Sequence, residues 1–466
     1  MDSEETSIAN EDSPKLLFSW KQVAIIGAVF AIVVVVLQRG LRYVCENHIE
    51  FDCPYYWPVS ILNLRFPSVV DLVVATAVIA AFFLLFRYLE AKRFSLVFAI
   101  LTGVLLISGL TFIHGRDVGF YAPIAGDARS GVLIPYSTDG QEYFHDASKV
   151  DDPIDFFRRY NEIQPTLHMH GHTHPPGAIL TFYLLIKVLR DPALIAIFMM
   201  LVSMTATAFF FHRILRSQFD DGTTTRYTTL LLLLLPALQI YYLATIDAVV
   251  ASLLVGVLYF FCFGKGTKSI VGATALLTGS FLLTFVSLFI LPVLVGFDLI
   301  IRRSLKRSAI VIGGMVAAFV LIYLVTGYNA FESFRTASKY ENPIGFMLFV
   351  DPANYFFTRV EDVAEILFFL GPFLLVLLIR GMRKFRLRPL DVLTALGCVT
   401  LLAMYVAGAW RTGETARAGL FIYPYLLFPV ARYLEEANTG MQGRLQLAAL
   451  VFLQAVALQT IGNFHW

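Results

Sequence analysis

Apolar residues fill most of the chain in stretches close to the length that crosses a lipid bilayer, and short polar segments separate them. Lipid cannot satisfy the hydrogen bonds of an open sheet, so these stretches predict helices. We expect an all-α fold, a polytopic transmembrane helix bundle of about 13 spans. The expected spans lie near 20–38, 68–86, 95–113, 193–211, 228–246, 247–263, 269–286, 288–301, 308–326, 363–380, 389–409, 418–434 and 445–462.

The composition agrees with a membrane protein. Of 466 residues, 58% are hydrophobic and only 15% are charged, and the mean hydropathy is +0.70. A soluble domain has about 25% charged residues, so too little polar surface is present to cover a soluble core of this size. We expect the lipid bilayer as a partner and no nucleic acid. Residues 1–19 form a polar tail, whose acidic start differs from the basic beginning of a signal peptide.

Basic residues set the expected orientation. Short connections rich in Lys and Arg face the cytoplasm, so an even number of spans must separate them. This predicts a cytoplasmic N-terminus, an outer C-terminus at Trp466 and two crossings between 269 and 301. The basic connections are Arg87/Lys92/Arg93, Lys265/Lys268, Arg302/Arg303/Lys306/Arg307 and Arg380/Arg383/Lys384/Arg386/Arg388.

The apolar run 177–189 is too short to span comfortably. If it crossed, every later basic connection would face outward, so we expect a helix that lies flat at the membrane interface. Three larger segments are then outside, at 38–67, 114–192 and 327–362, together with the short loop 410–417.

Four cysteines are present. Cys45 and Cys53 share the first outer segment, where they either form a disulfide or stay free thiols. Cys262 and Cys398 fall in expected spans and are interpreted as small apolar residues.

An acidic segment stands in the long outer loop 114–192. At helical spacing, Asp139, Glu142 with Tyr143, and Asp146 share one face. Clustered carboxylates beside a membrane can supply a general base or bind a metal ion. The alternative is a solvated helix face with Asp139 as its N-cap.

Four alternating histidines close the same loop, at His168, His170, His172 and His174. In an extended segment they would share one face, as metal-binding imidazoles could. No cysteine or carboxylate is interleaved at a known ligand spacing, which favours a role without metal. The following Pro-Pro-Gly at 175–177 ends this segment and starts the short helix.

A carboxylate and a short charged loop complete the candidates. Asp247 opens an expected span, either as the helix N-cap, which we favour, or as a functional group facing a cavity. Arg411, Glu414 and Arg417 recur at spacings of three, so they can share a face. Arginine on the outer side opposes the positive-inside trend, which suggests phosphate binding, with an Arg–Glu ion pair as the alternative.

Arg335 and Lys339, in the segment 327–362, are further candidates for phosphate contact. A solvated loop explains them more simply.

Several short motifs, in this order, resemble the membrane glycosyltransferases of the C-type fold, which include protein O-mannosyltransferases and lipid A aminoarabinose transferases. The likeness covers most of the chain from about residue 95 onward, and it identifies 20–94 as an extra N-terminal helical hairpin before the domain 95–466. Asp139 lies farther from its span than is usual in the family, so Asp117 or Asp127 is an alternative base. The motifs are DGQEYFHDA (139–147), HGHTHPPG (170–177), TIDA (245–248) and WRTGETAR (410–417), followed by Pro424.

The resemblance implies an enzyme that transfers a hexosyl or pentosyl group, with inversion, from a polyprenyl-phosphate donor. The acceptor, an unidentified glycan, lipid or protein, would be met at the outer face of a cytoplasmic membrane. Asp139 would be the base, and Arg417 with Arg411 would bind the donor phosphate. Residues that orient the acceptor or bind metal would be Glu142, Tyr143, Asp146, His170 and His174, with Glu414 and Asp247 in support. No cofactor is certain, because the family includes enzymes with and without a divalent metal ion.

Other functions fit the same architecture. A multi-pass transporter or permease would need buried charges inside its spans, which look almost free of charge. A lipid-linked glycan ligase or polymerase would differ mainly in its acceptor. A non-catalytic scaffold would leave the dense Asp/His loop unexplained.

Overall fold

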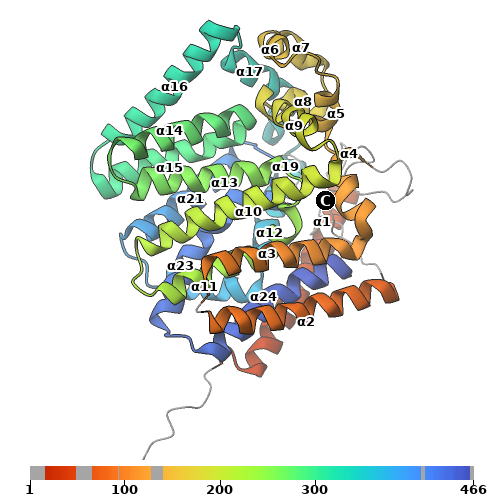
Figure 1. Cartoon of the computed structure of the whole chain (residues 1–466), viewed down its shortest axis with the longest axis vertical. Coiled ribbons are helices and arrows are strands. Elements are labelled where there is room, and N and C mark those ends of the chain that lie inside the picture. The colour runs from red at the N-terminus through yellow and green to blue at the C-terminus, as the bar shows by residue number, and fades with distance from the viewer. Residues whose placement is uncertain (1–15, 49–65, 93, 127–139, 411–414, 462–466) are drawn as a thin grey trace, which may run out of the picture.

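The computed structural model describes residues 16–48, 66–92, 94–126, 140–410 and 415–461, and every regular element in these ranges is a helix (Figure 1). Within them, nine helical stretches are long and apolar enough to cross a membrane. The described part of the chain is therefore all-helical, and the protein is a multi-pass membrane protein. The nine are α1 (Trp20–His48), α2 (Val69–Ala91), α3 with η1 (Leu96–His114), α10 (Pro192–Arg216), α13 with η4 (Ile246–Phe263), η5, α15 and η6 (Phe285–Arg302), α16 (Lys306–Thr326), α21 (Pro389–Val406) and α24 (Met441–Thr460).

Shorter helices connect these long ones or fill the space between them. One group, in the first long loop, is η2 (Asp117–Tyr121), α4 (Ala122–Ala125), α5 (Glu142–Ser148), α6 (Pro153–Arg158), α7 (Tyr160–Ile163), η3 (Gln164–Thr166), α8 (Met169–Thr173) and α9 (Pro176–Leu189). The others are α11 (Gly222–Leu234), α12 (Pro236–Tyr241), α14 (Gly266–Leu283), α17 (Ala330–Glu341), α18 (Met347–Val350), α19 (Pro352–Leu370), α20 (Pro372–Met382), α22 (Thr415–Ala418), η7 (Leu420–Ile422) and α23 (Tyr423–Glu436).

The expected count of about 13 spans is not confirmed, and the run 228–246 shows one reason. Pro236 cannot donate a backbone hydrogen bond, so α11 ends at Leu234 and α12 starts anew. The leucines from Leu230 to Leu235 are fully buried inside the protein. Hydropathy alone cannot distinguish such a core helix from one that faces lipid.

A sharp bend replaces the expected span 363–380. Helix α19 begins earlier, at Pro352, and meets α20 at 98°. Gly371 makes the turn with φ of +87°, a conformation that residues with a Cβ rarely adopt. Counted as one broken span, this pair raises the number of candidates to ten.

The core lies around α11, α13 and α23. Helix α10 packs against α13, α11 and α3, while α23 packs against α11, α20 and α21. Phe211 of α10 stacks on Phe428 of α23, with ring centroids 5.7 Å apart. Toward the N-terminus, α1 packs on α19 and α20, whereas α2 packs on α3 and α24. The two helices of the expected N-terminal hairpin therefore each join the main bundle.

Two of the basic connections lie side by side at one end of the bundle. The Arg302 guanidinium donates to the Phe261 carbonyl at 2.6 Å, and Arg307 donates to the Phe260 carbonyl at 2.6 Å. These contacts bring the connection at 265–268 next to the one at 302–307, as expected if both face the same side. Which side of the membrane that is stays a prediction.

The segments 114–192 and 327–362 also meet each other, near the top of Figure 1. Asn161 donates to the Asn329 carbonyl at 2.9 Å and accepts from the Asn329 N–H at 2.8 Å. His172 of α8 stacks on Tyr340 of α17, with centroids 4.0 Å apart. Because the two segments pack together, they lie at the same end of the bundle, as the expected topology requires.

The short apolar helix after the Pro-Pro-Gly segment is confirmed as α9, which packs against α5, α10 and α14. Gly177 allows that close approach, because a Cβ there would collide with the Leu282 backbone. Cys45 is disulfide-bonded, and Cys53 lies outside the described residues. Cys262 and Cys398 are free.

Candidate functional site

Three of the predicted site residues, Asp139, Arg411 and Glu414, lie outside the residues that the structure describes, as does the alternative base Asp127. The other alternative, Asp117, starts η2 and is exposed. The remaining predicted residues come from four separate segments: Glu142, Tyr143 and Asp146 from α5, His170 and His174 from α8 and its end, Asp247 from α13, and Arg417 from α22.

Helix α5 begins where the chain returns to the end of α4. The Gln141 N–H donates to the Ile124 carbonyl at 2.9 Å. Gly140 has φ of +71°, and a Cβ there would collide with the backbone of Gly126 and Ile124, so only glycine fits. The start of α5 is thereby held against α4, two residues before Glu142.

The expected helical face of α5 is confirmed for Glu142, Tyr143 and Asp146. The alternative of a solvated face capped by Asp139 is wrong. The N-cap is Gln141, and the exposed fractions of Tyr143 and Asp146 are only 3% and 4%. These side chains point into the protein because α8 and α9 cover them.

The histidine segment is helical, so the prediction of an extended strand with four histidines on one face is wrong. The carboxylates of α5 stabilise the first turn of α8 by accepting from its free N–H groups. Asp146 accepts from the His168 N–H at 3.1 Å, and Glu142 accepts from the His170 N–H at 2.6 Å. Gly171 lets the helices come this close, since a Cβ there would lie 2.5 Å from the Asp146 carboxylate.

The same carboxylates also bind the imidazole rings. His168 Nδ1 lies 2.6 Å from Asp146 Oδ1, and His170 Nδ1 lies 3.0 Å from Glu142 Oε2. Burial raises the pKa of Glu142, but the hydrogen bonds and charge of His170 outweigh it and lower the pKa to about 2. In the described ranges, no three His, Cys, Asp or Glu side chains are grouped so as to hold a metal ion. Glu142 and Asp146 fix α8 on α5 through these contacts.

His174 ends this segment beside Tyr143, with ring centroids 5.3 Å apart. Its Nδ1 lies 3.1 Å from the His170 carbonyl, which can only accept, so Nδ1 carries the hydrogen. Burial lowers the pKa of His174 to about 3, helped by the charges of His170 and Arg417. The ring is therefore neutral at pH 7, and its Nε2 is an acceptor.

Acidification is expected to destabilise the protein through His174. The unfolded imidazole titrates near pH 6.5, whereas the folded pKa is about 3, so only the unfolded state takes up a proton between these values. The stability is full above about pH 6.5 and is lost as the pH falls toward 3. Between pH 7 and 5 the free energy of unfolding should fall by about 1–2 kcal/mol through this residue.

Unfolding titrations of detergent-solubilised protein at the two pH values would check this. His174→Asn should reduce the pH dependence, while His48→Asn, which changes an exposed histidine, should leave it as in the wild type. An unchanged dependence in His174→Asn would contradict the assigned environment.

Asp247 and Arg417 form an ion pair whose charges act on Tyr143. Arg417 Nε lies 3.6 Å from Asp247 Oδ2, and the side chains are only 12% and 18% exposed, respectively. The favoured prediction that Asp247 is the helix cap is wrong. Thr245 is the N-cap and accepts from the Ala248 N–H at 3.2 Å, which leaves Asp247 in the first turn to pair with arginine.

Tyr143 connects this ion pair to the α5–α8 unit. Burial raises the pKa of its hydroxyl well above the usual value, the Asp247 charge raises it further, and the Arg417 charge opposes both. The hydroxyl is therefore protonated at neutral pH and can donate a hydrogen bond. The Tyr143 ring also stacks on Phe182 of α9.

Sequence reasoning missed the residues that position Arg417. Glu365 of α19 accepts from the Ala416 N–H at 3.1 Å and lies 3.3 Å from the Thr415 hydroxyl. Thr415 also donates to the Asp362 carbonyl at 2.9 Å. Helix α22 is therefore held at its start by α19, directly before Arg417.

The buried charges of α19 continue one turn earlier. The Arg359 guanidinium lies 2.9 Å from the Asp362 carboxylate and donates to the carbonyls of Tyr405 and Trp410. The carboxylates of Glu361, Asp362 and Glu365 are all almost completely buried. The sequence does carry a sign of this group: charges recur three and four residues apart just ahead of an apolar run, whereas isolated charges there would be costly.

The chain matches no family model, no curated protein and no solved structure. Its resemblance to C-type-fold glycosyltransferases therefore remains an expectation from its motifs. What the site can do follows from its own residues: an ion pair, a protonated tyrosine and a neutral histidine at one end of a membrane bundle.

Proposed function

We propose that this protein is a membrane glycosyltransferase that moves a sugar from a polyprenyl-phosphate donor to an acceptor at the outer face of a cell membrane. One observation carries the proposal. The charges of the Arg417–Asp247 ion pair act on the Tyr143 hydroxyl, and Tyr143 follows Glu142 of the Glu142–His170 pair in the segment 114–192, which packs against 327–362. A lipid-borne donor and a water-borne acceptor would meet at such a place.

Arg417 would bind and stabilise the leaving group. Cleavage of the sugar–phosphate bond leaves negative charge on the polyprenyl phosphate, and a guanidinium fits phosphate oxygens with two parallel hydrogen bonds. Asp247 supports the role, since its carboxylate holds the guanidinium in a largely buried position. Preorganised charge of this kind stabilises a transition state without reorganisation.

The acceptor would be activated by a carboxylate, for which Asp139 stays our assignment. The acceptor oxygen attacks the anomeric carbon, the bond from that carbon to the phosphate oxygen breaks, and the acceptor proton passes to the carboxylate. The phosphate keeps the bonding electrons, and one displacement inverts the anomeric centre. Protonated Tyr143 and neutral His174 would hold sugar or acceptor hydroxyls as donor and acceptor, respectively.

Glu365 would act as a positioning residue. Replacing it by glutamine removes the charge that accepts from Ala416 and Thr415, so α22 shifts and carries Arg417 with it. Since a shift of about 1 Å can cost about a hundredfold, we expect kcat to fall roughly tenfold to a hundredfold with the donor KM nearly unchanged. Asp391→Asn is the matched control, because Asp391 is a buried carboxylate paired with Arg432. Equal losses in both variants would reduce Glu365 to a stability role.

A transporter is the second candidate, and α19 favours it. Charged groups buried inside a membrane bundle often mark a transport path, and discontinuous helices recur in transporters. Arg359, Asp362 and Glu365 are such charges, and α19 meets α20 at 98°. A lipid-linked glycan ligase or polymerase would share the donor and differ in its acceptor.

An experiment in sealed vesicles that contain the purified protein distinguishes sugar transfer from transport. With a radiolabelled polyprenyl-phosphate sugar and a mixture of acceptor glycans and lipids, a transferase converts label into a new covalent product. A transporter instead moves label or free sugar across the membrane without a new bond. Movement without product would overturn the proposal in favour of the transporter.

A further inference from the structure

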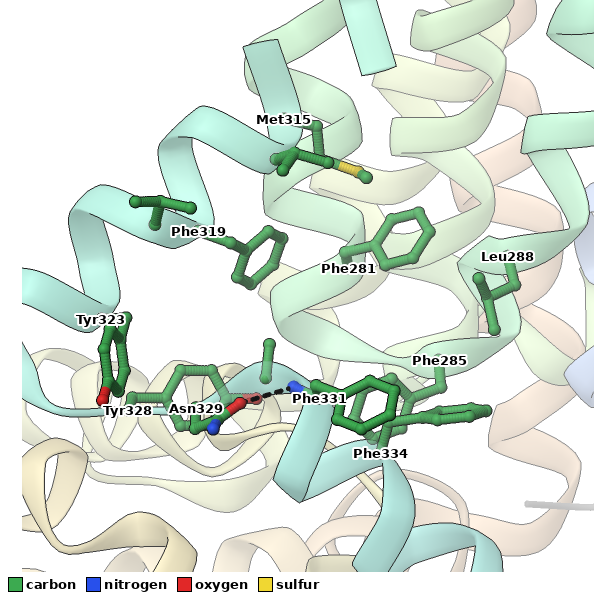
Figure 2. A pocket seen from close by; sticks show the side chains of 13 residues that line it. Phe281, Phe285, Leu288, Met315, Phe319, Tyr323, Tyr328, Asn329, Phe331 and Phe334 are labelled. Carbon is green, nitrogen blue, oxygen red and sulfur yellow. Dashed lines mark hydrogen bonds between the residues drawn. The ribbon is translucent and has the colours of Figure 1, made fainter. Parts of the chain in front are cut away.

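An apolar groove opens between α14 with η5 on one side and α16 on the other (Figure 2). The start of α17 closes one end. The groove encloses about 670 Å³. Its walls are mostly aromatic and aliphatic, among them Phe281, Phe285, Leu288, Met315, Phe319 and Phe334.

One wall of the groove is α16, a helix that is long and apolar enough to cross a membrane. Only 11% of the most apolar 18-residue stretch of α16 is buried inside the protein. Val320, which lines the groove, is 51% exposed, and Leu324 one turn later is 73% exposed. A helix of this kind contacts lipid tails, so the natural occupant of a groove along it is a hydrocarbon chain.

A basic surface on α17 adjoins the groove. Phe331 and Phe334 also line a second hollow of about 520 Å³, where Arg335 and Lys339 of α17 stand one helical turn apart. Neither side chain has an ion-pair partner in the part of the chain that the structure describes. Two exposed cations beside an apolar groove complement an anionic headgroup on a lipid tail.

Helix α17, which carries these two cations, is held in place by hydrogen bonds and packing. Asn329 caps α17 by accepting from the Phe331 N–H at 3.1 Å, the bond drawn in Figure 2. The buried side of α17 packs on α8 and η3, and Gln164 of η3 donates to the Ser333 carbonyl at 3.2 Å. Arg335 and Lys339 therefore stand on a fixed helix.

We propose that this groove is a binding site for an anionic, phosphate-bearing membrane lipid. One tail lies among the phenylalanine rings, and the phosphate contacts Arg335 and Lys339. This lipid site includes neither Arg417 nor Asp247. Lipid binding there does not depend on sugar transfer.

Photo-cross-linking tests the site in full-length protein placed in phosphatidylcholine nanodiscs. The probe is phosphatidic acid with a diazirine in one acyl chain, and diacylglycerol with the same chain is the phosphate-free comparison. Phosphatidic acid should label the peptides around Phe281–Leu288 and Val316–Tyr323 at least about fivefold more than diacylglycerol does. Equal labelling by both probes would overturn the proposal.

Matched variants separate the site from general contact with lipid. The charge reversal Arg335→Glu with Lys339→Glu should lower labelling by phosphatidic acid at least about tenfold, while Lys265→Glu with Lys268→Glu, the same charge change elsewhere on the surface, should not. Val320→Trp should fill the groove and lower labelling, whereas Val325→Trp, exposed on the same helix but outside the groove, should not. If neither test variant lowers the labelling by phosphatidic acid, the probe contacts only the ordinary lipid around the protein, and the proposal is wrong.

Discussion

Replacing Arg417 by alanine is expected to lower kcat/KM for sugar transfer roughly 10²- to 10³-fold, the usual cost of losing one preorganised charge at a developing anion. The guanidinium is only 12% exposed and lies against Asp247, so water cannot fully replace it. Arg417→Lys keeps the charge but loses the planar, two-pronged contact, and should fall between the wild type and alanine. Rates would be measured with purified protein and a polyprenyl-phosphate sugar.

The control for Arg417 must also break a partly buried ion pair, because an unpaired carboxylate can itself destabilise the fold. Arg444 pairs with Glu90, and each of these side chains is 19% exposed. Arg444→Ala should match Arg417→Ala in unfolding experiments and yet transfer sugar at close to the wild-type rate. If both variants lose the same activity, Arg417 has no special part in transfer.

The second large effect is expected at Asp139. Asp139→Asn removes the proton acceptor and should lower kcat roughly 10²- to 10⁴-fold, with the donor KM nearly unchanged. Asp151→Asn, an exposed change in the same loop, serves as the control. Single-turnover experiments would separate the chemical step from donor binding.

Full activity in Asp139→Asn would show that another carboxylate is the catalytic base. Glu142 and Asp146 already accept hydrogen bonds from α8, and Asp117 is exposed at the start of η2. Asp127 would then be the next variant to measure.

Local patterns predicted the parts of the site that depend on one helix. Glu142, Tyr143 and Asp146 share a face because helical spacing requires it, and α9 starts after Pro175 because proline favours a first turn. The common end of the segments 114–192 and 327–362 followed from counting crossings between basic connections. Such features need no knowledge of distant contacts.

Features that depend on distant contacts were not predictable in this way. The alternating histidines suggest a strand, but α8 becomes helical because carboxylates of α5, more than twenty residues earlier, stabilise its first turn. The leucines of α11 read as a span because burial in protein and burial in lipid select the same residues. The role of Glu365 could not be predicted, because this residue holds α22, which lies fifty residues away in the sequence.

The central claim is that this membrane protein cleaves a polyprenyl-phosphate sugar at the site around Arg417 and Asp247. The most direct measurement follows release of free polyprenyl phosphate from a panel of such donors by purified protein, with acceptor mixtures, with and without chelator. We expect release from at least one donor by the wild type and almost none by Arg417→Ala, and the chelator arm shows whether a metal ion takes part. Equal release by the wild type and Arg417→Ala, or no release from any donor with any acceptor, would contradict the claim.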